Sequence, residues 1–203
     1  MKVALIGASG NVGSRIAAEL VSRGHDVTGI ARHPENIMIN DRINPAKGDI
    51  KDLEELSQLL AGHDAAISAV RFIELDPNIL IDAVKKANMK RLLVVGGAGS
   101  LEVAPGLDLV DSPELPDAYK AEATAGRDLL NVLRGEQELD WIFLSPSAVF
   151  APGERTGQFR LGKDQLLSDD KGESKISMED YAIAMVDELE NQQHSRERFT
   201  VGY

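Results

Sequence analysis

The sequence predicts an α/β fold: a doubly wound, mostly parallel sheet with helices on both faces. Two observations predict it. The first is a series of short apolar runs, which suit strands buried on both faces. The second is that segments whose apolar residues recur at helical spacing alternate with these runs. Successive strands joined through helices pair in parallel, and their crossovers lay helices over both faces of the sheet. Ligands of such sheets bind beyond the carboxyl ends of the strands.

The elements are placed in order along the chain. Strands are expected at residues 3–6, 25–30, 43–47, 64–70, 91–95, 141–144 and 199–201. Helices are expected around 12–20, 53–60, 77–87, 119–134 and 182–189, where apolar residues share one face. Pro77 suits a first helical turn. Ser177, followed by Glu179 and Asp180, has the residues of a helix N-terminus.

The alternation of strand-like and helix-like segments ends at about residue 150, where a polar loop with several glycines begins. We expect residues 164–167 and 173–176 to pair as a hairpin around the turn-rich stretch 169–172. The length of 203 residues predicts a single domain, residues 1–203, with a small substrate-side portion from about residue 150.

The composition narrows the classes of partner. A net charge of −11 disfavours nucleic acid and anionic membrane surfaces as partners. No apolar run approaches the roughly 20 residues that cross a bilayer, and no secretion signal opens the chain. The absence of cysteine excludes disulfides and thiolate metal sites, and it fits a cytoplasmic protein. No histidine spacing suggests metal ligands, so we expect no metal.

Three glycines, spaced by three, follow the first predicted strand: Gly7, Gly10 and Gly13. Gly7 allows a sharp turn off the strand, Gly10 allows a ligand to approach the backbone, and Gly13 allows the helix to lie close to the sheet. The unpaired N–H groups at the helix start then offer a site for a diphosphate. A merely tight turn between strand and helix would need only one or two of these glycines.

The loop after the second strand predicts which nucleotide binds. An NAD-preferring fold places an acidic residue there to bond the ribose 2′-hydroxyl, but this strand runs into Ala31 and Arg32. The planar guanidinium of Arg32 can hold a 2′-phosphate. We therefore expect NADP(H), with NAD(H) as the alternative. The competing interpretation of Arg32 is a solvated surface side chain.

These residues resemble a known family. The stretch Gly7-Ala-Ser-Gly-Asn-Val-Gly13, Arg32, the stretch Gly48-Asp49-Ile50 and the segment 177–182 are similar to the atypical short-chain dehydrogenase/reductases. The nearest group is the NmrA-like, NAD(P)H-binding set described as NADH-flavin reductases, similar to biliverdin reductase B. The resemblance extends over essentially the whole chain and implies a Rossmann domain.

The resemblance also implies cofactor contacts. Besides the glycines, Ser9, Asn11 and Val12 would surround the diphosphate. Asp49 and Ile50 would lie at the adenine, and Ala69 and Val70 beside the diphosphate and the nicotinamide ribose. Pro146 and Ser147 would line the nicotinamide. Asp49 has a second, compatible interpretation as the cap of the helix that contains Leu53.

The catalytic residues depart from the wider family, which pairs a tyrosine with a lysine four residues later. Here Tyr119 is followed at that spacing by Ala123, and Lys120 is preceded at that spacing by Pro116. NmrA-like proteins resemble the second of these spacings, in which the lysine is kept without its tyrosine. This resemblance assigns Lys120 to the nicotinamide ribose and the substrate. Tyr119 is a secondary proton donor, or a partly buried residue at a helix start. Ser100 is a candidate substrate-binding residue, or a plain turn serine.

Without a tyrosine–lysine acid, the sequence favours substrates that need little proton supply from the enzyme. We therefore expect an NADPH-dependent oxidoreductase that transfers hydride to a flavin, a quinone or a similar small conjugated acceptor. The alternative is a non-catalytic sensor of NADP(H). Sugar-nucleotide epimerase or dehydratase chemistry is less favoured, because the region after residue 150 is short. A homodimer is compatible with the sequence.

Overall fold

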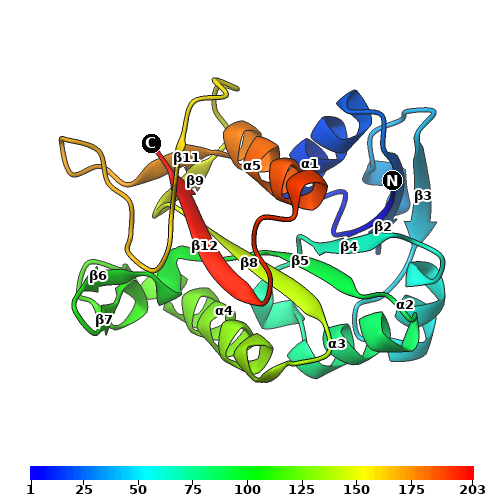
Figure 1. The fold of residues 1–203 in the computed structure, drawn as a ribbon, viewed down its shortest axis with the longest axis horizontal. Helices are drawn as coiled ribbons and strands as arrows, with labels where there is room; N and C mark the ends of the chain where they lie inside the picture. The colour runs from blue at the N-terminus through cyan, green and yellow to red at the C-terminus, as the bar shows by residue number, and fades with distance from the viewer.

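The fold is built on a central sheet of eight strands in the order β10-β12-β8-β5-β4-β1-β2-β3 (Figure 1). The computed structural model describes residues 1–203. The strands are β1 (Lys2–Ile6), β2 (Asp26–Ala31), β3 (Ile43–Lys47), β4 (Ala65–Ser68), β5 (Arg91–Val95), β8 (Asp140–Pro146), β10 (Arg160–Gly162) and β12 (Glu197–Gly202). Neighbouring strands pair in parallel, except that β10 is antiparallel to β12. The predicted doubly wound, mostly parallel fold is confirmed.

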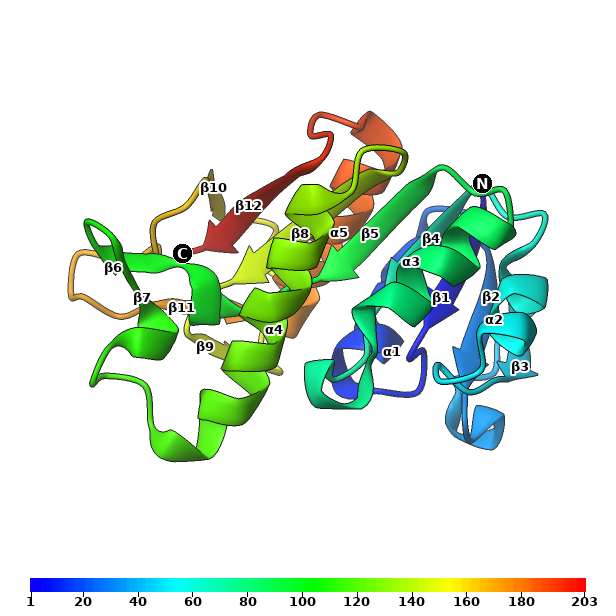
Figure 2. The ribbon, with the colours of Figure 1, turned by 90° about the horizontal axis from the view of Figure 1, so that it is seen from below.

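Helices cover both faces of the sheet. The helices α1 (Asn11–Ser22) and α5 (Met178–Asn191) lie on one face, whereas α2 (Leu53–Leu60), α3 (Pro77–Lys86) and α4 (Asp117–Gly135) lie on the other (Figures 1 and 2). Each face has its own apolar core, because successive side chains of a strand point to opposite sides. Within β1, Val3 and Leu5 enter the core under α1 and α5, while Ala4 and Ile6 enter the core under α2 to α4. None of the five helices combines the length and the hydropathy needed to cross a bilayer.

The predicted hairpin in the C-terminal region is wrong. The turn itself forms, since the Gly172 N–H donates to the Asp169 carbonyl at 2.9 Å. After the turn, however, β11 (Lys175–Ser177) pairs in parallel with β9 (Val149–Ala151). Residues 164–167 run beside Glu102 instead, whose N–H donates to the Asp164 carbonyl at 2.8 Å. Turn residues encode a local reversal, but they do not select the strand that pairs after it.

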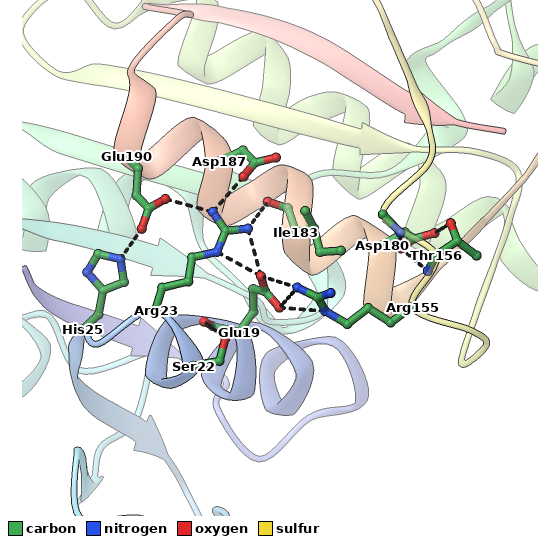
Figure 3. Close-up of polar contacts among 11 residues, drawn as sticks. Glu19, Ser22, Arg23, His25, Arg155, Thr156, Asp180, Ile183, Asp187 and Glu190 are labelled. Carbon is green, nitrogen blue, oxygen red and sulfur yellow. Dashed lines mark hydrogen bonds and ion pairs between the residues drawn. The ribbon is translucent and has the colours of Figure 1, made fainter.

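An ion-pair network joins α1 to α5 and to the loop after β9 (Figure 3). Glu19 of α1 is 6% exposed and accepts hydrogen bonds from Arg23 at 2.9 Å and from Arg155 at 2.9–3.1 Å. Burial by itself would raise the pKa of Glu19, but the hydrogen bonds from Arg155 and Arg23 outweigh it and lower that pKa. Arg23 also reaches Asp187 and Glu190 of α5, at 2.7 and 2.8 Å.

The N-terminus of α5 binds the same loop through Asp180. As predicted, Ser177 caps this helix and accepts from the Asp180 N–H at 3.0 Å. The buried Asp180 carboxylate accepts from the Thr156 hydroxyl at 2.5 Å and from the Thr156 and Gly157 N–H groups at 2.8 Å. The Tyr203 hydroxyl donates to it at 2.8 Å. Burial opposes ionisation, yet these four donors prevail and lower the pKa of Asp180.

Asp180→Asn should destabilise the protein by about 2 kcal/mol at pH 7, because several donors lose a charged acceptor. The folded-state pKa of Asp180 lies below its ordinary value of 3.8. The carboxylate therefore contributes fully above that ordinary value, and its contribution is lost as the pH falls through the folded-state pKa. Urea unfolding across the acid range should show the wild-type and variant curves parallel near neutrality and converging below about pH 4. The exposed Asp170→Asn is the matched control, and equal stability losses in the two variants would contradict the assignment.

Candidate functional site

A cleft opens at the carboxyl ends of β1, β2 and β4, where an open parallel sheet binds its ligands. Its volume is about 220 Å³. The lining residues are Ile6, Gly7, Ser9, Gly10, Ile30, Ala31, Arg32, Gly48, Asp49, Ile50, Lys51, Ala69, Val70, Arg71 and Glu74. Eight of the residues predicted to bind a cofactor are therefore brought together: Gly7, Ser9, Gly10, Arg32, Asp49, Ile50, Ala69 and Val70.

The turn from β1 into α1 leaves no room for side chains at two glycines. Gly7 has φ of +84°, and a Cβ there would lie 2.5 Å from the Ala69 carbonyl oxygen. A Cβ on Gly13 would overlap the carbonyl of Gly7. The Gly7 N–H donates to the Ile30 carbonyl at 2.8 Å, which ties the turn to the end of β2. Backbone from β1, β2, β4 and α1 thus converges at one point.

The N-terminus of α1 opens onto this cleft. Gly10 is its N-cap and supplies no side-chain cap. The N–H groups of Asn11, Val12 and Gly13 have no acceptor within the protein. Gly10 lines the cleft, and a Cβ there would meet the Gly7 carbonyl oxygen at 3.3 Å and the Ala69 carbonyl oxygen at 4.0 Å. Unpaired donors and the positive end of the helix dipole suit a diphosphate, so the turn fits the central part of a dinucleotide.

The far end of the cleft carries charged side chains that suit the adenosine portion. Arg32 follows β2, is largely exposed, and lies with Nη2 2.9 Å from Oε2 of Glu74. Asp49 accepts the Lys51 N–H at 3.0 Å through Oδ1. The alternative interpretation of Asp49 as a helix cap is wrong. Asp52 caps α2, because its side chain accepts from the Glu55 N–H at 2.9 Å.

Three charged residues of the cleft were not anticipated from the sequence: Lys51, Arg71 and Glu74. Of the three, only Lys51 could have been found from the sequence, because it immediately follows the Gly48-Asp49-Ile50 stretch that was predicted to bind the cofactor. Glu74 belongs to a short 3-10 helix, η2 (Phe72–Glu74), after β4. It is 42 residues from Arg32 in the chain, and no pattern in the sequence relates the two.

The predicted catalytic residues lie elsewhere. Tyr119 and Lys120 are in the first turn of α4, outside the lining of this cleft. Tyr119 is 64% exposed, so the idea of a partly buried residue is wrong. It lies one helical turn before Ala123, which packs against Gly99 in the loop after β5. Lys120 is exposed and pairs with Asp117 at 2.8 Å, and this contact holds the pKa of the Asp117 carboxyl below its usual value.

Ser100, Pro146 and Ser147 are buried at the carboxyl ends of β5 and β8. The Ser100 hydroxyl and carbonyl oxygens accept hydrogen bonds from the Arg198 guanidinium at 3.3 and 3.1 Å. The Ser147 hydroxyl donates to the Val201 carbonyl at 3.1 Å. Both serines thus contact β12, and neither lines the cleft beside α1.

The chain belongs to the NAD(P)H-binding family: the model of that family matches residues 7–192. YwnB of Bacillus subtilis, an uncharacterised protein, is 40% identical over 209 residues, covering 99% of this chain and 98% of YwnB. The predicted NAD(P)H-binding family is therefore confirmed. The protein carries an oxidoreductase-like Rossmann fold, and its cofactor is a nicotinamide dinucleotide.

Solved structures agree with this assignment. A Bacteroides thetaiotaomicron protein described as a "putative epimerase" is 48% identical with a TM-score of 0.95, covering 100% of this chain and 96% of that one. A Streptococcus pneumoniae protein described as a "putative NADH-flavin reductase" is 37% identical with a TM-score of 0.83, covering 100% and 99%. A Veillonella parvula short-chain dehydrogenase/reductase in complex with NADP shares the fold at 18% identity, with a TM-score of 0.80 and coverage of 100% and 94%.

Alanine at Gly7 and alanine at Gly10 should have separable effects. Gly7→Ala should cost about 2 kcal/mol of stability or more, because the new methyl group meets the Ala69 carbonyl at a positive φ. Gly10→Ala should fold with a change of about 1 kcal/mol or less. If the diphosphate binds at this turn as expected, the new methyl group would obstruct it, so NADPH affinity should fall about tenfold or more.

Chemical unfolding measures the stability change, and quenching of intrinsic fluorescence measures NADPH affinity. Gly135→Ala at the end of α4, where a Cβ meets nothing within 4 Å, is the control. Undiminished NADPH binding by Gly10→Ala would place the diphosphate away from this turn.

Proposed function

We propose that this protein is an NADPH-dependent reductase of flavins, quinones or similar small conjugated acceptors. The observation that carries the proposal is a dinucleotide cleft without a tyrosine–lysine acid beside it. Pro116 stands four residues before Lys120, where the wider family has its tyrosine, and Lys120 pairs with Asp117 at the surface. The name of the pneumococcal relative supports the same acceptor class.

Binding and orientation are the tasks of the residues around the cleft. The N–H groups of Asn11, Val12 and Gly13 would bind the diphosphate, and Arg32 would bind the 2′-phosphate through its guanidinium. Ala69 and Val70 would lie beside the diphosphate and the nicotinamide ribose. Together they would hold the nicotinamide beyond the ends of β4, β5 and β8.

The nicotinamide cofactor supplies a hydride when it is bound. A flavin or quinone needs little help from the protein, because its conjugated ring delocalises the added charge and solvent can protonate it. The chain's contribution would be to keep the acceptor flat beside the cofactor. Tyr119 lies outside the cleft, but it is exposed one helical turn before Ala123, which packs on the loop after β5, and its ring would serve this purpose.

Two alternatives keep specific support. An NADP(H) sensor is favoured by the same lack of a visible acid–base pair. Epimerase chemistry is favoured by the name of the Bacteroides relative. Epimerases of the wider family depend on the tyrosine–lysine pair, which this chain lacks, so the reductase remains the better-supported function.

The deciding experiment follows oxidation of NADPH and NADH with FMN, riboflavin and menadione. We expect turnover that persists in Tyr119→Phe within about threefold, because the acceptors do not require its proton. NADPH binding without turnover would favour the sensor. Interconversion of UDP-sugars, abolished by Tyr119→Phe, would favour the epimerase and overturn the proposal.

Arg32→Ala should weaken NADPH binding about tenfold, the low end for a charge-assisted contact because the guanidinium is largely exposed. NADH binding should change less than about twofold, since it lacks the phosphate. Fluorescence titration at constant ionic strength measures both affinities. Arg42→Ala removes another exposed arginine outside the cleft and serves as the control. Equal losses for the two nucleotides would show that Arg32 does not recognise the 2′-phosphate.

A further inference from the structure

We propose that Glu74 sets the nucleotide selectivity of this protein by competing with the 2′-phosphate for Arg32. This inference rests on the proposed function, because it assumes that Arg32 receives that phosphate. It assigns to a second residue, on a different element, control over how strongly NADPH is preferred to NADH.

The two side chains meet across the cleft. Arg32 follows β2 and Glu74 ends η2, after β4, and both line the cavity. Nη2 of Arg32 lies 2.9 Å from Oε2 of Glu74, with side-chain exposures of 65% and 34%. Glu74 forms no other ion pair. Its carboxylate therefore occupies part of the donor fork that a phosphate would use.

A 2′-phosphate and the Glu74 carboxylate carry the same sign of charge. When the phosphate approaches Arg32, the carboxylate must either give up the guanidinium or share it at close range, and both cost binding free energy. NADH brings no such charge. The cost therefore falls on NADPH alone and narrows the difference between the two affinities.

Glu74 has little freedom to withdraw, because η2 is anchored to α4 and to the core. The Phe72 N–H donates to Oε1 of Glu122 at 2.7 Å. The Phe72 ring stacks on Phe143 with centroids 6.1 Å apart, and it packs against Gly126 of α4. The carboxylate can rotate about its own side-chain bonds, but its backbone stays at the rim of the cleft.

The other charged residues of the cleft do not duplicate this contact. Arg71 points toward Glu122, at 3.6 Å, and Lys51 forms no ion pair with Glu74. Asp49, the second carboxylate of the cleft, accepts the Lys51 N–H. The Arg32–Glu74 pair is thus the direct link between a cation suited to the 2′-phosphate and an opposing carboxylate.

The experiment compares Glu74→Gln with the wild type in binding alone. NADPH and NADH are titrated by fluorescence, and adenosine 2′,5′-bisphosphate and AMP by calorimetry, so that the adenosine portion is measured without the nicotinamide. Glu74→Gln should tighten NADPH and the bisphosphate about fivefold, the scale of an exposed ion pair. NADH and AMP should change less than about twofold. Glu35→Gln removes a carboxylate outside the cleft, paired with His33, and should change none of the four.

Each other result overturns the inference. An unchanged NADPH affinity in Glu74→Gln, or the same gain in Glu35→Gln, would remove Glu74 as the determinant. A selective loss of NADH would mean that Glu74 bonds the ribose hydroxyls instead. Failure of the proposed function would look different. The wild type would then turn over no conjugated acceptor, or Arg32→Ala would leave the relative affinities for NADPH and NADH unchanged.

Discussion

The close approach of backbone at Gly7 is the constraint on which the rest of the structure depends. A Cβ on Gly7 would lie only 2.5 Å from the carbonyl oxygen of Ala69, just after β4, and a Cβ on Gly13 would lie only 2.0 Å from the carbonyl oxygen of Gly7. Because no side chain separates them, β1, β4 and the start of α1 come together at backbone distance. That convergence places the N-terminus of α1, with three unpaired N–H groups, beside the cleft that Gly10 lines.

The C-terminal region is attached to the helix that begins at this turn. Arg155 binds Glu19 on α1, and Thr156 and Gly157 bind Asp180 on α5. Both carboxylates are buried and remain ionised because several donors replace the water they lose. The loop after β9 is therefore held in place by charge-assisted contacts, while the apolar residues of α1 and α5 form the core beneath it.

The two halves of the candidate site differ in whether their residues are close together in the sequence. The turn from β1 into α1 is built from seven consecutive residues and the strand before them, so local patterns were sufficient to predict its shape. The proposed nicotinamide end would depend on residues that follow β4, β5 and β8. Tyr119, Lys120 and Ser100 were assigned there by resemblance. In the structure Tyr119 is exposed, Lys120 pairs with Asp117, and Ser100 accepts from Arg198. Their contributions to catalysis remain predictions.

The sequence by itself determined the alternation of strands and helices, the order of the main elements, the glycine turn and the family. The first three follow from apolar periodicity or from the steric demands of a few adjacent residues, whereas the family was predicted from the resemblance of these motifs to known proteins. Only the tertiary structure decided that β11 pairs with β9, that Asp52 rather than Asp49 caps α2, and that Glu74 meets Arg32. A short strand or a surface carboxylate has many compatible partners along the chain, and only packing of the whole sheet selects one of them.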